Sequence, residues 1–277
     1  MALGAPRVAS IGDNCIDRYE EPVALSAVGG NALNVAVRWR RAGFRAEYLG
    51  AVGPDEAGAR IRGALEREEV AIDRLRTLPG RTGDTRIRLT AQGERVFVAE
   101  DYGVSADYAP TAADLEHLRT LDHVHVANLF EPEPVIRALR DGRARVSHDL
   151  GERRPLPAMP GLDLVLLSMP KASSDEAAAR AAHDAVAAGA ATALVTNGAG
   201  GSVACEGGRV VSMPAVPVEV VDTCGAGDAY LAEFVAERLR GGPLERCMEA
   251  GAGAAARCCA SLGAWSQELE PVAEAVR

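Results

Sequence analysis

The sequence is poor in lysine and in aromatic residues. Lys171 is the only lysine among the 30 basic residues, and aromatic residues make up 4% of the 277 positions. A P-loop is excluded, because its G-x-x-x-x-G-K-[ST] pattern is absent. The 6 cysteines form no C-x-x-C pair and have no histidine at zinc-site spacing. No apolar run is long enough to cross a membrane.

The chain is acidic, with a formal charge of −9 and a pI near 5.2. This balance argues against nucleic acid or an anionic membrane surface as the main partner. A hydrophobic content of 48% and a charged content of 25% are ordinary for a globular enzyme. The first residues lack a signal-peptide pattern, so we expect a cytoplasmic protein.

Strand-like and helix-like segments alternate over most of the chain. Strands are expected at 8–12, 48–52, 123–127, 144–149, 164–168 and 193–197, and helices at 31–41, 55–69, 133–140, 174–188, 226–240 and 244–261. This alternation predicts one α/β domain over residues 1–277, with a mostly parallel sheet and helices on both of its faces.

Two stretches depart from this alternation. Residues 18–28 have no helical periodicity and are expected to be extended, and residues 84–101 have the pattern of a β-hairpin. A few antiparallel strands are not stable alone, so these strands need a partner surface. They are expected to form either a small β-strand lid over a site or a contact between two copies of the chain.

The most informative segment is DTCGAGD at 222–228, which leads into the expected helix 226–240. A glycine-rich turn at a helix N-terminus binds anions, because the first backbone N–H groups lack partners and the helix dipole favours negative charge. A carboxylate beside bound phosphate needs another role, and Asp228 is placed to accept the proton of an attacking hydroxyl. The alternative is a helix N-terminal charge, worth about 0.3–1 kcal/mol.

A second glycine-rich element, GGNALN at 29–34, opens the expected helix 31–41, and polar residues at 12–17 follow the first expected strand. Paired glycines let a backbone approach a ligand closely. Ligands of open α/β sheets bind at the carboxyl ends of strands. Asp17 and Asn34 are therefore expected to hydrogen-bond a polyol, the alternatives being a turn cap and a solvated helix residue.

Together these elements resemble the ribokinase-like (PfkB) carbohydrate kinases. The 29–34 and 222–228 strings are similar to that family's two signatures, and TNGAGGS at 196–202 resembles its nucleotide-binding turn. The resemblance extends from about residue 8 to 265 and implies ATP and Mg²⁺ as cofactors, with K⁺ used in related enzymes. The residues implied are Asp228, Gly225, Ala226 and Gly227 for catalysis, Asp13, Asp17, Gly30 and Asn34 for the sugar, Thr196, Gly198, Gly200 and Thr223 for the nucleotide, and Asp222 for a metal.

Short strings at 11–17, 29–37, 95–97 and 263–265 are similar to those of kinases that act on Amadori compounds. This narrower resemblance implies phosphorylation of the C6 hydroxyl of a fructoselysine-like substrate. The alternatives are a kinase for another small sugar or a nucleoside, and a non-catalytic sugar or nucleotide sensor. The last is motivated by residues 168–171, SMPK, which stand where the family has an N-x-x-E metal motif.

Two further expectations concern charge. Cys224 lies beside the predicted anion site, where a helix dipole should lower the pKa of a thiol. Arg86, Arg88 and Arg95 lie in the expected hairpin, where they either meet a charged group of the substrate or form a solvated strand face.

Overall fold

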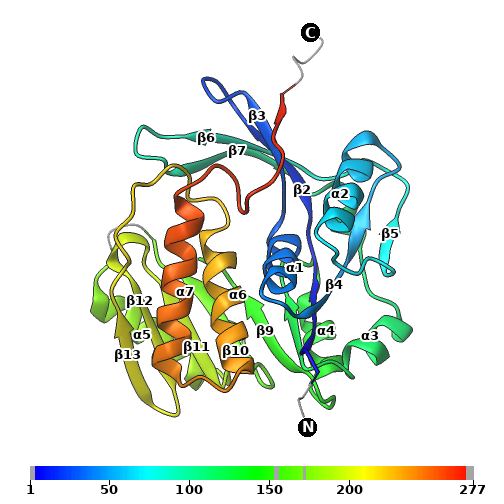
Figure 1. The fold of residues 1–277 in the computed structure, drawn as a ribbon. Helices are drawn as coiled ribbons and strands as arrows, with labels where there is room; N and C mark the ends of the chain where they lie inside the picture. Colours follow the sequence, from blue (N-terminus) through cyan, green and yellow to red (C-terminus); the bar gives the residue numbers. More distant parts are fainter. Residues whose placement is uncertain (1–3, 153–155, 171–172, 273–277) are drawn as a thin grey trace.

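The computed structural model describes residues 4–152, 156–170 and 173–272 (Figure 1). Lys171 lies outside these ranges. The body of the molecule is a nine-stranded sheet. Its strands, in order across the sheet, are β13 (Arg209–Met213), β12 (Ser202–Glu206), β11 (Thr192–Thr196), β10 (Leu164–Ser168), β9 (Arg145–Asp149), β8 (His123–Val126), β1 (Arg7–Ile11), β4 (Arg45–Val52) and β5 (Leu75–Thr77).

Neighbouring strands of this sheet are parallel, except that β12 runs antiparallel to both β11 and β13. The mostly parallel sheet confirms the predicted fold class. Three strands of this sheet, β5, β12 and β13, were not predicted from the sequence. β12 and β13 form an antiparallel hairpin at one edge. β13 is largely exposed, and β12, although buried, has only the short apolar run Val203, Ala204 and Cys205.

Helices cover both faces of the sheet (Figure 1). α1 (Asn31–Arg41), α6 (Ala226–Leu239) and α7 (Leu244–Cys259) cover one face, and α3 (Ala112–Leu118), α4 (Pro132–Leu139) and α5 (Asp175–Ala187) cover the other. Side chains of a strand alternate between faces. Leu166 accordingly packs with α6, and Leu167 packs in the opposite layer.

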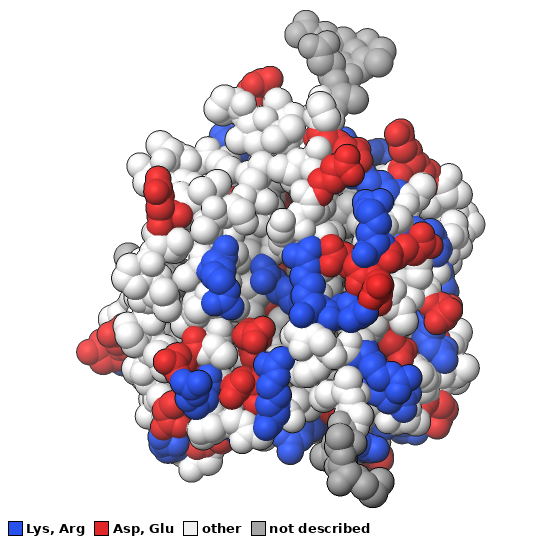
Figure 2. All heavy atoms as spheres, viewed as in Figure 1, with Lys and Arg blue, Asp and Glu red and all other residues white. Residues whose placement is uncertain are grey.

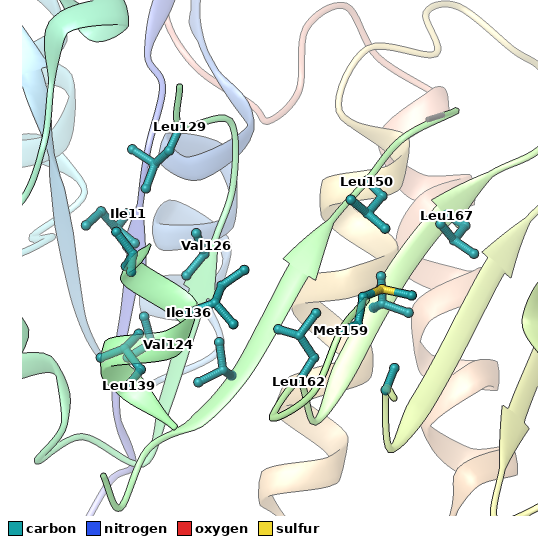
Figure 3. Close-up of a cluster of buried hydrophobic side chains, with 14 of the residues drawn as sticks. Ile11, Val124, Val126, Leu129, Ile136, Leu139, Leu150, Met159, Leu162 and Leu167 are labelled. Carbon is teal, nitrogen blue, oxygen red and sulfur yellow. The ribbon is translucent and has the colours of Figure 1, made fainter. Parts of the chain in front are cut away.

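The layer beneath α4 illustrates this packing (Figure 3). Val124 and Val126 of β8 lie in one buried cluster with Ile136 and Leu139 of α4. Each of these side chains is at most 9% exposed, so burial of the apolar face of α4 fixes the helix against the sheet. No helix of the described ranges is long and apolar enough to cross a membrane.

A second sheet lies across the carboxyl ends of the main strands, at the top of Figure 1. Its order is β14 (Glu270–Pro271), β3 (Leu25–Gly29), β2 (Cys15–Tyr19), β6 (Asp84–Leu89) and β7 (Arg95–Asp101). Residues 18–28, expected as one extended stretch, instead span the end of β2, a turn and most of β3. The remaining helix, α2 (Glu56–Arg67), packs between this sheet and β4.

Candidate active site

The predicted anion-binding turn stands at the N-terminus of α6. Gly225 precedes the helix with a φ of 69°, a left-handed conformation that favours glycine. A Cβ there would lie 2.3 Å from the Cβ of Ala264. Ala226 and Gly227 form the first turn of α6, and the Ala226 N–H makes a 3.3 Å bond to the carbonyl of Thr223. The positive end of the helix dipole therefore opens at this turn.

Residues of the 222–228 segment line two cavities: Cys224 lines the first, and Thr223, Ala226 and Gly227 line the second. We call the first, of about 200 Å³, the acidic cavity. Of the described residues that line it, Asp13, Asp17, Glu100, Asp101 and Asp149 supply carboxylates and Arg95 supplies the one guanidinium. We call the second, of about 450 Å³, the apolar cavity; no charged side chain is among the described residues that line it.

Asp228 follows Gly227, which lines the apolar cavity, in the first turn of α6. It is 6% exposed, and its Oδ2 accepts a 2.8 Å hydrogen bond from the Nδ2 of Asn34, which lines the acidic cavity. Burial raises the pKa of Asp228 to about 7, the Asn34 donor opposes that rise, and the charge of Asp149 adds to it. A carboxylate with a pKa near neutrality is suited to take a proton.

Asp17 projects from β2 into the acidic cavity. The thiols of Cys15 and Cys224 lie 3.3 and 3.6 Å from its two carboxylate oxygens. Burial raises the pKa of Asp17 to about 6. A Cβ on Gly29 would lie 2.1 Å from Asp17 Oδ2, so the first glycine of the 29–34 element makes room for this carboxylate.

The expectation for Cys224 is wrong. Burial, followed by the negative charge of Asp17, raises the pKa of the Cys224 thiol well above its usual value. The side chain is 3% exposed. The sequence indicated a helix N-terminus nearby, but it did not reveal that the thiol is turned toward Asp17 rather than toward solvent.

Asp13 has a structural role as well as a place in the cavity. Its carboxylate accepts 3.1 Å hydrogen bonds from the N–H groups of Asn31 and Ala32, and so caps α1. Gly30, the N-cap residue, has a φ of 111°. A Cβ at Gly30 would lie 2.5 Å from the Cα of Asn14. Gly30 therefore lets the start of α1 close against the loop after β1.

Asp222, the predicted metal residue, is fully buried. It accepts hydrogen bonds from the Tyr19 hydroxyl at 2.6 Å and from the N–H groups of Cys224 and Gly263, both at 2.8 Å. These three donors belong to the second sheet, the α6 turn and the C-terminal segment. Asp222 thus joins the three parts of the chain that surround the site.

The predicted nucleotide residues gather around the apolar cavity. Thr196, Gly198 and Thr223 line it together with Ala226 and Gly227 of the α6 turn. Gly200 does not line it but ends the same 3₁₀ turn, Gly198–Gly200, after β11. The cavity is also lined by valines of the loop before α6, and the corresponding upper left of Figure 2 is largely uncharged.

Asn14 is a residue to which the sequence analysis gave no role. It lines the acidic cavity, and its Nδ2 donates to the Tyr48 hydroxyl and the Ala51 carbonyl at 2.8 and 2.7 Å. Within the described ranges, its Oδ1 and that of Asn34 are buried without a hydrogen-bond partner. Buried acceptors of this kind are costly unless water or a ligand donates to them, so both are available to the hydroxyl groups of a ligand.

The arginines of the hairpin separate into two groups. Arg95 lines the acidic cavity, with its guanidinium 4.1 Å from the centre of the Phe97 ring. Arg86 and Arg88 are exposed, and Arg88 pairs with Glu20 at 2.7 Å. Asp149 also lines the cavity, at the carboxyl end of β9. Arg95 pairs with Leu89, so it lies on the other face of the hairpin from Arg86 and Arg88. The sequence does not reveal this pairing.

The donor set around Asp228 fits Mg²⁺ only as a partner of phosphate. Over the described ranges, no group of three or more His, Cys, Asp or Glu side chains could enclose a metal. Mg²⁺ commonly uses one or two carboxylates plus phosphates and retains several waters. Asp149 and Asp228, whose charges interact, satisfy this lower requirement.

Structural comparison defines the class of protein. The structure of Arabidopsis thaliana ribokinase complexed with ribose and ATP aligns with a TM-score of 0.83 over 94% of each chain, at 24% identity. The fold is therefore ribokinase-like. The site described above lies where its sheet meets the N-terminus of α6.

Sequence comparison gives the family. The pfkB family carbohydrate kinases match residues 17–143 and 159–270, and the chain belongs to this family. Fructoselysine 6-kinase of Shigella flexneri is 34% identical over 262 residues, which covers 93% of this chain and 99% of that one. Fructosamine kinase of Bacillus subtilis is 30% identical, with 94% and 93% covered. This chain is an ATP-dependent carbohydrate kinase that acts on a small-molecule sugar.

Proposed function

We propose that the protein phosphorylates the C6 hydroxyl of a fructoselysine-like Amadori compound. The observation that carries this proposal is the acidic cavity, whose described lining residues supply five carboxylates and one guanidinium and include Asn34, the hydrogen-bond partner of Asp228. An Amadori compound bears a protonated amine beside its sugar, so its charge complements this lining. The names of the two bacterial relatives support the same substrate class.

In the proposed reaction, the sugar lies in the acidic cavity and ATP lies in the apolar cavity. The C6 oxygen forms a bond to the γ-phosphorus as the bond from that phosphorus to the bridging oxygen of ADP breaks. Asp228 takes the hydroxyl proton, and the unpaired Oδ1 of Asn34 accepts a hydrogen bond from a neighbouring sugar hydroxyl. Positioning of this kind contributes up to about 7–11 kcal/mol.

The backbone N–H groups of Gly225, Ala226 and Gly227 would donate hydrogen bonds to the oxygens of the transferred phosphoryl group and so stabilise its negative charge. Mg²⁺ on the phosphates, near Asp149 and Asp228, would neutralise part of the remaining charge. We also propose that K⁺ binds behind this turn, near Asp222 and neighbouring carbonyls. Activity should then fall when choline replaces K⁺; equal activity in both buffers would count against K⁺.

The test is an ADP-release screen at equal concentrations of fructoselysine, other Amadori compounds, fructose, ribose and adenosine. Fructoselysine is expected to give the highest kcat/KM, and ³¹P NMR of its product should place the phosphate on C6. Preference for fructose, ribose or adenosine would replace the proposed substrate. Sugar binding in calorimetry with no ADP formed from any compound would favour a sensor.

We further propose that two copies of the chain associate through the second sheet. β7 is an edge strand of that sheet, and its Val96 and Val98 are 42% and 37% exposed. Unpaired edge strands are ready to pair with another strand. Light scattering should give the mass of a dimer, and the Val96→Lys variant should be monomeric. We propose a cytoplasmic location, because all six cysteines are free thiols.

A further inference from the structure

The pairing of β6 with β7 contains an irregularity that changes which side chains face the acidic cavity. Ile87 pairs with Phe97, but the next residue back, Arg86, pairs with Ala99. Val98 is therefore an extra residue on β7, which is the definition of a β-bulge. Beyond it the pairing resumes, with Thr85 opposite Glu100.

The bulge reverses the alternation of β7. Residues opposite each other in a sheet direct their side chains to the same face. Thr85 lines the acidic cavity and Ile87, two residues on, is buried on the same side. Phe97 and Glu100, their partners, thus share this face although they are three residues apart. Both line the cavity, whereas a regular strand would have directed Glu100 to the opposite face.

The charge of Glu100 lacks a protein partner. Within the described ranges it forms no ion pair, and Arg95, the one guanidinium of the cavity, is engaged elsewhere. Arg95 stacks on Phe97 and lies 3.7 Å from the thiol of Cys224. Phe97 and Tyr102, 46% and 45% exposed, also line the cavity, so they and Glu100 form a wall of aromatic and anionic groups.

This wall belongs to a different part of the chain from the reacting end. Asn34 and Asp228 come from α1 and α6, whereas Glu100 comes from the second sheet. In an Amadori compound, the amine is attached to C1, at the other end of the sugar from the C6 hydroxyl. A sugar with its C6 hydroxyl at Asp228 therefore extends its C1 substituent away from α6.

We propose that Glu100, directed into the cavity by the bulge at Val98, binds the protonated secondary amine of the substrate and thereby determines specificity for amine-linked sugars. The rings of Phe97 and Tyr102 flank the same cation, which the faces of aromatic rings attract. This inference rests on the proposed function, and it assigns to one side chain the distinction between an Amadori compound and a neutral ketose.

The test compares two enzymes with two substrates. The enzymes are the wild type and Glu100→Gln, and the substrates are fructoselysine and its analogue with an ether oxygen in place of the amine nitrogen. Glu100→Gln should lower kcat/KM for fructoselysine about 10- to 100-fold, the range for a hydrogen bond to a charged group. The value for the ether should change by less than about 2-fold, since it has no charge to lose.

Asp107→Asn is the matched control, because it removes an exposed carboxylate a few residues from the cavity wall. This variant should leave kcat/KM unchanged for both substrates. Equal losses for the amine and the ether in Glu100→Gln would show a structural role and overturn the inference. An unchanged value for fructoselysine would overturn it as well, while wild-type turnover of fructoselysine would leave the proposed function standing. Failure of the wild type to use fructoselysine would overturn both.

Discussion

The acidic cavity and the apolar cavity, both lined in part by residues of the 222–228 segment, differ in how they can recognise a ligand. The acidic cavity is lined by five carboxylates and one guanidinium, and it contains two buried amide oxygens without partners in the described protein. The apolar cavity is lined by small and branched side chains, with no charge among its described lining residues. The first therefore selects by charge and hydrogen bonding, and the second selects by shape.

ATP is more highly charged than the sugar substrate, yet the proposed function places its nucleoside in the cavity without charged side chains among its described lining residues. In the absence of a P-loop lysine, the proposed function requires the backbone of the α6 turn to bind the phosphates, with the uncharged part of the nucleotide in the apolar cavity. In this proposal the charged side chains lie on the sugar side, in the acidic cavity. Substitutions on the two sides should consequently affect different kinetic constants.

The largest effect is expected at Asp228, in the first turn of α6. Asp228→Asn should lower kcat by about 10²–10⁴-fold, the contribution of a positioned general base. ATP affinity should be nearly unchanged, because the apolar cavity and the backbone turn remain intact. Turnover assays and calorimetry with ATP measure the two quantities. Turnover close to that of the wild type would remove Asp228 from the chemistry.

The α6 turn allows a probe of the phosphate site that spares the fold. A Cβ at Gly227 would meet only Leu166 Cδ2, at 3.9 Å, an ordinary contact. Gly227→Ala should therefore fold normally, yet lower kcat/KM about 10-fold or more by obstructing the phosphoryl group. Gly225→Ala, with its contact to Ala264 and left-handed φ, should instead lower thermal stability. Full activity of Gly227→Ala would argue that the phosphates bind elsewhere.

A charge placed in the apolar cavity should affect ATP alone. Val218 lines this cavity and is 38% exposed, so Val218→Asp should be tolerated by the fold. We expect KM for ATP to rise about 10-fold through repulsion and lost apolar contact, with KM for the sugar unchanged. Val210→Asp, at a site 44% exposed on β13, is the control. An equal rise in both KM values would contradict the separation of the cavities.

The smallest effect is on stability. The pKa of Asp228 is raised from 3.8 to about 7 by burial, so its ionised form is disfavoured in the folded state. This destabilisation is absent at pH values below 3.8, the pKa of Asp228 in the unfolded chain, and complete above about pH 7. Asp228→Asn should therefore raise the free energy of unfolding by about 2 kcal/mol more at about pH 8 than at about pH 5. Denaturant titrations at both pH values measure the difference, and a gain independent of pH would contradict the raised pKa.

The sequence predicted the central strands of the main sheet because they are continuous apolar runs, but it did not predict β5, β12 and β13 toward its two edges. It was less informative about the second sheet, where the register between distant strands decides what faces the site. The bulge at Val98, which brings Glu100 into the cavity, and the C-terminal strand β14, which pairs with β3, leave no clear local signal.

The candidate site was likewise predicted only in part from the sequence. The glycine-rich strings predicted the α6 turn, because the φ of Gly225 favours glycine. They also singled out Asp228 and Asn34, which a hydrogen bond joins in the structure and whose roles stay predictions. Asn14 was assigned no role, and Arg95 was left between a substrate contact and a solvated strand face, since their place in the cavity depends on contacts between segments far apart in the sequence. The thiol of Cys224 was misjudged for the same reason.

The pH dependence of kcat/KM for the sugar tests the role of Asp228 most directly. For a base of the free enzyme, kcat/KM should rise with pH through an apparent pKa of about 7. Replacement of Asn34 by Ala should move that rise to higher pH, because the variant loses the hydrogen bond that lowers the pKa of Asp228. The residual activity of Asp228→Asn should lack the rise. A wild-type profile that is flat from about pH 5 to about pH 9, or a rise that persists in Asp228→Asn, would contradict the account.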